Sequence, residues 1–153
     1  MSTTDTFTEL AWAVRRHIFA TIVDTGWPPT VETTAADLGL PVDDVRAAYD
    51  WLNAKHALYL TPGTHDVRIA NPFSGVPTDY RVRANGRDYA ANCAWDALGI
   101  PAALGADATI TATLPDGAGE ATLAVLDGRV NGNGEVVHIL LPVRRWYDDL
   151  VFT

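Results

Sequence analysis

Cys93 and Asp96 are the two residues of this sequence whose types and spacing favour a specific chemistry. In a helical segment their Cβ atoms would lie roughly 5–6 Å apart on one face, because residues three positions apart are neighbours on a helix. A thiolate is a soft metal ligand and a nucleophile, and a carboxyl group delivers or accepts a proton. Together they can bind a soft metal and protonate a group that leaves it. The same spacing fits a structural pair, with Cys93 as a small buried hydrophobe and Asp96 as a helix-surface carboxylate.

Two tryptophans are candidates for a pocket beside this pair. Trp95 and Trp146 carry large apolar rings that suit an organic group, although such rings more often fill a hydrophobic core. The four histidines show no metal-ligand spacing, and we expect them to pack or to lie at the surface (His17, His56, His65 and His138). Asp148 and Asp149 are expected to be a solvated pair and not a metal site.

The composition of the 153 residues predicts a globular protein with one full-sized domain or two small ones. Hydrophobic residues make up 48% and charged residues 20%, which provides enough apolar surface to offset the entropy of folding. No apolar run reaches the roughly 18 residues of a membrane span, and the N-terminus lacks the features of a signal peptide, so we expect a cytoplasmic protein without membrane contacts. The single cysteine excludes an internal disulfide and a multi-cysteine zinc site made by this chain alone.

The first third of the chain has the periodicity of three helices. Apolar residues recur at helical spacing from Leu10 to Ile22, a short helix is expected over 33–40, and a third helix opens at 41–44 with acids in its first turn. Two extended stretches follow at 58–61 and 67–70, joined by turn-forming residues. Three helices followed by a hairpin are the arrangement of a winged helix-turn-helix, so residues 1–70 are predicted to form a winged-helix-like module.

The charge of this module disfavours nucleic acid as a partner. The net charge of the chain is −8, which repels phosphate backbones. The third predicted helix, which would enter the major groove, carries more acids than bases (Asp43, Asp44 and Asp50 against Arg46 and Lys55). Because nucleic-acid binding depends on cationic contacts, we do not expect it here.

The rest of the chain predicts an antiparallel sheet with one helix. Residues 71–77 are rich in proline and small residues and are interpreted as a linker, which leaves 78–153 as an α+β module. A strand is expected at 80–82 and a helix from Tyr89 to about Leu104, interrupted at 99–101; further strands are expected at 108–113, 120–126, 136–143 and 150–152. The predicted fold class is α+β: a winged-helix-like module, then an antiparallel sheet module with a packed helix that carries the Cys-x-x-Asp motif.

Segment 87–105, with its Cys-Ala-Trp-Asp core at 93–96, resembles the active-site segment of the alkylmercury lyases. Residues 71–74 and the final stretch 146–153 resemble the same family. The resemblance implies protonolysis of a carbon–mercury bond, which releases a hydrocarbon and mercuric ion. It implies that Cys93 binds the mercury as a thiolate and that Asp96 passes a proton to the departing carbon. It further implies a small organomercurial as ligand and no cofactor, since the mercury belongs to the substrate.

The family's second catalytic cysteine has no counterpart in this sequence, because it follows the stretch that resembles 149–153. Either the sequence stops short of that residue or the chain comes from a relative that lacks it; a small external thiol would then supply the second sulfur. Two alternatives to a lyase remain open. One is a family relative that catalyses another reaction or only binds a soft or small organic ligand. The other is a winged-helix regulator that responds to a metal, which would bind DNA at ~0.15 M salt.

Overall fold

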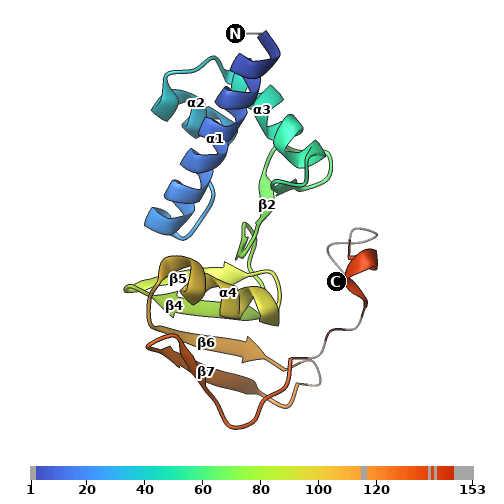
Figure 1. Cartoon of the computed structure of the whole chain (residues 1–153). Coiled ribbons are helices and arrows are strands. Elements are labelled where there is room, and N and C mark those ends of the chain that lie inside the picture. The colour runs from blue at the N-terminus through green and yellow to red at the C-terminus, as the bar shows by residue number, and fades with distance from the viewer. Residues whose placement is uncertain (1–2, 115–116, 138, 140, 147–153) are drawn as a thin grey trace.

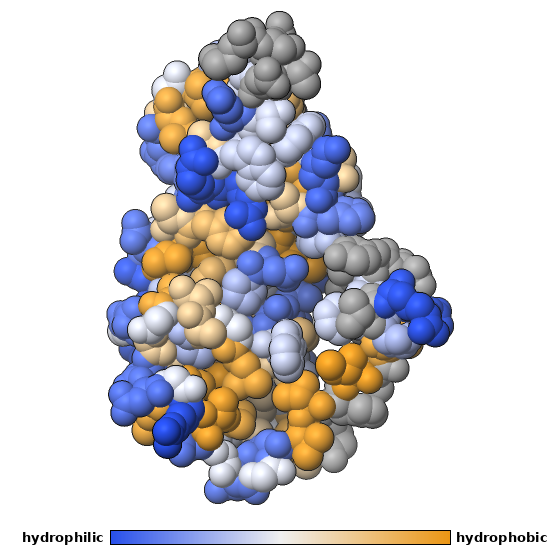
Figure 2. Space-filling view, viewed as in Figure 1, coloured by the Kyte–Doolittle hydropathy of each residue, from blue (hydrophilic) through white to orange (hydrophobic). Residues whose placement is uncertain are grey.

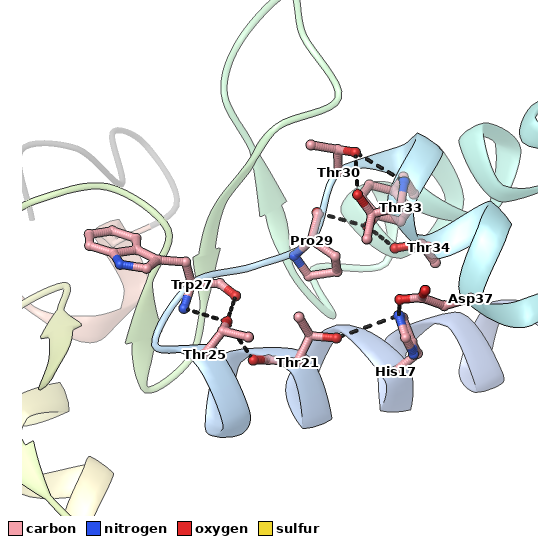
Figure 3. Close-up of polar contacts among 10 residues, drawn as sticks. His17, Thr21, Thr25, Trp27, Pro29, Thr30, Thr33, Thr34 and Asp37 are labelled. Atoms are coloured by element: carbon pink, nitrogen blue, oxygen red, sulfur yellow. Dashed lines mark hydrogen bonds and ion pairs between the residues drawn. The ribbon is translucent and has the colours of Figure 1, made fainter. Parts of the chain in front are cut away.

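Helices α1 (Thr3–Thr25), α2 (Val31–Leu38) and α3 (Val42–Ala54) form one end of the molecule in the computed structural model, which describes residues 3–114, 117–137, 139 and 141–146. The Thr30 side chain accepts a hydrogen bond from the Thr33 N–H and so caps the start of α2. Gly39, in the left-handed conformation, ends the same helix. Figure 3 shows this cap together with the contact between His17 of α1 and Asp37 of α2.

A buried tyrosine fixes the packing of α3 against the segment that precedes α2. Tyr49 is fully buried, and its hydroxyl donates to the Pro29 carbonyl at 3.3 Å and is hydrogen-bonded to the Thr34 hydroxyl at 2.9 Å. Burial raises the pKa of Tyr49 to about 12. The phenol therefore stays protonated and both buried hydroxyls are hydrogen-bonded, as buried polar groups require.

The strands that the structure describes form one antiparallel sheet in the order β1-β2-β3-β5-β4-β6-β7-β8. Helix α4 (Ala94–Leu104) follows β5 and packs on β4, β5 and β6, as Figure 1 shows, and the short 3₁₀ helix η1 (Val143–Arg145) comes after the sheet. The strand bounds are β1 (Tyr59–Leu60), β2 (Val67–Ala70), β3 (Phe73–Ser74), β4 (Tyr80–Ala84), β5 (Arg87–Ala91), β6 (Ala108–Thr113), β7 (Glu120–Leu126) and β8 (Arg129–Asn131).

One hydrophobic core runs through the helices and the sheet. It includes Ile18 of α1, Leu52 of α3, Val82 of β4, Ile100 of α4 and Ile110 of β6, all buried. Figure 2 shows that hydrophobic side chains also reach the surface over the part of the molecule formed by the sheet. Within the described ranges, no helix is both long and apolar enough to cross a membrane.

The predicted combination of helices with an antiparallel sheet is confirmed. Strands β2, β6 and β7 occupy the predicted residues, β4 extends the predicted strand to Ala84, and β1 is shorter than predicted. The winged-helix character of the first 70 residues and the division into modules stay predictions.

The predicted helix from Tyr89 to about Leu104 is wrong in its first part. Residues 87–91 form β5, and the helix begins only at Ala94 and runs through Gly99-Ile100-Pro101 without a break. Strand β5 pairs along its whole length with β4, and its last residue, Ala91, also pairs with Phe73. This pairing outweighs the local helix preference of alanine, which is worth less than about 1 kcal/mol per residue.

Two further segments differ from the expected structure. Segment 71–77, predicted as a linker, contains β3, whose Phe73 and Ser74 are buried and paired in the sheet. In the stretch predicted as a strand at 136–143, residues 136, 137, 139, 141 and 142 are not in a strand, and Val143 begins η1. Val136 is 87% exposed. A strand-like sequence forms a strand only where a neighbouring strand pairs with it, and the described residues of this stretch are not paired. The predicted strand at 150–152 lies outside the described residues.

Candidate active site

Cys93 and Asp96 meet at the start of helix α4. Cys93 is the N-cap residue, with extended backbone angles, and its Sγ accepts a hydrogen bond from the Asp96 N–H at 3.5 Å. The Cys93 thiol lies 3.5 Å from Asp96 Oδ2, to which it donates. The sequence predicted two neighbours on one face of a helix. The structure instead pairs them through a helix cap, in which the carboxylate sits in the first turn.

The direction in which the chain reaches Cys93 is set by the end of β5. The Thr78 hydroxyl donates to the Ala91 carbonyl at 2.6 Å, two residues before Cys93. Helix α4 also lies close to the segment before β3, because a Cβ placed on Gly99 would come within 3.2 Å of Pro72 Cβ. A glycine at this position therefore permits the close approach. Sequence reasoning assigned no positioning role to Thr78 and interpreted Gly99 only as part of a helix interruption, since each contacts a residue distant in the sequence.

The environment of the pair favours its protonated forms. Burial raises the pKa of the Cys93 thiol; the N–H of Asp96 lowers it and the Asp96 carboxylate raises it, by smaller amounts. Burial also raises the pKa of Asp96, against the opposing effect of the hydrogen bond from Cys93. A soft metal that bonds to the thiol sulfur displaces its proton, and the neighbouring carboxyl group, which holds a proton more readily than usual, can accept that proton and later donate it.

Replacing Asp96 by asparagine is expected to lower the pKa of Cys93, because the neighbouring negative charge is removed while the main-chain N–H remains. Alkylation by iodoacetamide requires the thiolate, so the rate at pH 8 should rise at least about threefold and the pH–rate profile should move to lower pH. Cys93 is the only cysteine, so the alkylated fraction measured by mass spectrometry reports this residue alone. A slower reaction, or an unchanged profile, would contradict the assigned electrostatics.

The predicted tryptophans lie in different surroundings. Trp95, in the first turn of α4, is 62% exposed. Trp146 is half-buried and donates its indole N–H to the Leu141 carbonyl at 2.9 Å. The pocket formed by the two tryptophans beside Cys93 stays a prediction.

Among the histidines and aspartates that were not expected to bind a metal, two histidines form contacts separate from the Cys93–Asp96 pair. His17 contacts Asp37 and His65 contacts Asp50, at 3.2 and 3.1 Å. His138 and the pair 148–149 lie outside the described residues. Among the residues that the structure describes, no group of three or more histidine, cysteine, aspartate or glutamate side chains could hold a metal ion.

The fold and the site define a class: an α+β protein in which a thiol and a carboxyl group are paired where a strand passes into a helix. Comparison with known proteins agrees with this description. The alkylmercury lyase family matches residues 73–152, which is more than half of the chain and includes both members of the pair. The chain therefore belongs to the alkylmercury lyase family.

A solved structure, the mercury-bound form of MerB2, has a similar fold, with a TM-score of 0.61 and 24% sequence identity. The similarity covers 82% of this chain but only 64% of that protein, so this chain spans less than two thirds of its length. None of the curated proteins matches the chain significantly.

Proposed function

We propose that this protein cleaves carbon–mercury bonds by protonolysis, with Cys93 as the mercury ligand and Asp96 as the proton donor. The observation that carries the proposal is the 3.5 Å contact between Cys93 Sγ and Asp96 Oδ2, within a segment that matches the alkylmercury lyase family. A protein of similar fold binds mercury. A soft thiolate beside a proton-holding carboxyl supplies both requirements of the reaction.

The first step transfers a proton within the pair. An organomercury cation bonds to Cys93 Sγ, and the thiol proton moves to the Asp96 carboxylate, which lies within hydrogen-bonding distance. The products are a sulfur–mercury bond at Cys93 and a neutral carboxyl group at Asp96. The raised pKa of Asp96 favours this proton-loaded form.

The second step breaks the carbon–mercury bond. A thiolate from a small external thiol bonds to the mercury, and the bonding electrons of the carbon–mercury bond take the proton from Asp96. The hydrocarbon leaves, Asp96 returns to a carboxylate, and mercuric ion remains bound to two sulfurs. The external thiol enters the proposal because Cys93 is the only cysteine of the sequence. Such thiols are abundant in the reducing cytoplasm, the compartment that we propose for this protein.

Incubation with phenylmercuric acetate tests this function. We expect benzene release, measured by gas chromatography, when a small thiol is added in excess, and stoichiometric mercury binding with little release when it is omitted. Denatured protein with the same thiol measures the background reaction. Stoichiometric binding without benzene release under either condition would contradict the lyase function and favour a protein that only binds the soft ligand.

Two finer features belong to the same proposal. Trp95 and Trp146 are proposed to contact the organic group, since apolar rings suit a hydrocarbon. Residues 1–70 are proposed to be a winged-helix-like module, because α1, α2 and α3 precede the antiparallel pair β1–β2. The exposed acids Asp43 and Asp44 in the first turn of α3 support a role for this module other than nucleic-acid binding.

A further inference from the structure

We infer that helix α1 positions Cys93 by holding strand β5, and that Tyr89 is the positioning residue that joins the two elements. Tyr89 lies on β5, four residues before Cys93, and is only 3% exposed. Its hydroxyl donates to the carbonyl of Val23, near the end of α1, at 2.9 Å. This inference rests on the proposed function for the role of Cys93, whereas the geometry stands without it.

A close approach of main chains occurs beside this hydrogen bond. Gly26 follows α1 with φ of +88°, and a Cβ placed on it would lie 2.7 Å from the carbonyl oxygen of Asp88, the residue before Tyr89. The end of α1 therefore contacts the backbone of β5 directly. In Figure 1 this end of α1 points toward β5 and α4.

Aromatic rings form a second connection between α1 and the end of β5. Phe19 of α1 packs edge-on against Phe73 of β3 with ring centroids 6.4 Å apart, and Phe73 packs against Tyr89 at 5.4 Å. Phe73 also pairs with Ala91, the last residue of β5. Helix α1 thus holds β5 in two ways, directly through Tyr89 of β5 and indirectly through Phe73 of the neighbouring strand β3.

Holding β5 determines where the thiol lies, because a single residue separates the strand from the cap. Ala91 is fixed by its pairing with Phe73 and by the hydroxyl of Thr78, and Asn92 alone stands between Ala91 and Cys93. If β5 loosens, the cap that keeps Cys93 half-buried beside Asp96 loosens with it. A more solvated thiol ionises more easily, so its reactivity reports the position of β5.

The Tyr89→Phe variant of the full chain tests this inference, because it removes the hydroxyl and keeps the ring. We expect alkylation of Cys93 by iodoacetamide at pH 8 to become at least about threefold faster, with the pH–rate profile displaced to lower pH. Phe19→Leu, which keeps the hydroxyl and removes one ring contact, should displace the profile in the same direction. Native folding of each variant is checked by circular dichroism.

Tyr49→Phe is the matched control, since it also removes a buried tyrosine hydroxyl, but one bonded to Thr34 and Pro29 away from β5. It should lower the melting temperature and leave the alkylation profile of Cys93 unchanged. A parent-like profile in Tyr89→Phe, or an equal acceleration in Tyr49→Phe, would overturn the inference. Alkylation needs no organomercurial, so a failure of the lyase activity would not be mistaken for a failure of this inference.

Discussion

The Asp96→Asn variant is expected to bind an organomercurial as the parent chain does and to release hydrocarbon at least about a hundredfold more slowly, which is the effect of losing a general acid. The amide cannot donate a proton to the departing carbon, whereas Cys93 still bonds to the mercury. The measurement is single-turnover release of benzene from phenylmercuric acetate with added thiol, alongside mercury bound after gel filtration.

Two further variants separate the role of Asp96 from a general effect of charge. Asp43→Asn removes an exposed carboxylate from α3 that pairs with Arg46, away from both the cap and β5, so release should stay near the parent rate. Cys93→Ser should abolish mercury binding and release together, because a hydroxyl is a poor ligand for a soft metal. If Asp96→Asn keeps the parent rate, Asp96 is not the proton donor.

Gly75→Ala is expected to cause the largest loss of stability of the substitutions considered, about 3 kcal/mol. A Cβ at residue 75 would collide with the carbonyl oxygen of Val67 on β2, so the chain beside β3 would have to move. The Gly75 N–H donates to the Arg68 carbonyl at 2.7 Å, and this movement would break that bond. Thermal unfolding should show a melting temperature lower by roughly 6–12 °C.

Gly63→Ala is the control for this stability prediction. Gly63 lies in the turn between β1 and β2 with φ of +77°, and its Cβ would meet nothing within 4 Å. Only the left-handed backbone conformation opposes alanine there, at a cost of about 1 kcal/mol. Similar melting temperatures for the two variants would mean that segment 71–77 tolerates change as a linker does, contrary to its packing in the structure.

The stretches that the sequence predicted well are those in which local pattern and tertiary environment agree. Helix α3 forms where the sequence predicted it, with acidic residues in its first turn and an apolar stripe that lies buried in the core and includes Val45 and Leu52. Strands β6 and β7 are flanked by segments that contain glycine, and Ala108–Thr113 of β6 pairs with residues 120–125 of β7. In these elements neighbouring residues carry enough information to specify the structure.

The stretches that the sequence predicted wrongly are those in which a distant partner decides. The run Tyr89-Ala90-Ala91 suits a helix locally, but β4 and β3 lie on both sides of it and make it a strand. Phe73 and Ser74 look like part of a linker until β2 and β5 pair with them. Residues 136–139 have the pattern of a strand, and those that the structure describes are exposed outside any strand.

By itself the sequence determined the residue types of the candidate site, the thiol of Cys93 and the carboxyl of Asp96, and the resemblance that points to carbon–mercury chemistry. Only the tertiary structure decided that Cys93 caps α4 and that burial raises the pKa of both groups. It also decided that Tyr89 connects β5, the strand that leads to Cys93, to α1. The physical reason is one of range. Helical periodicity and turn chemistry depend on a few adjacent residues, whereas strand pairing, burial and the direction of a cap depend on residues that only the folded chain brings together.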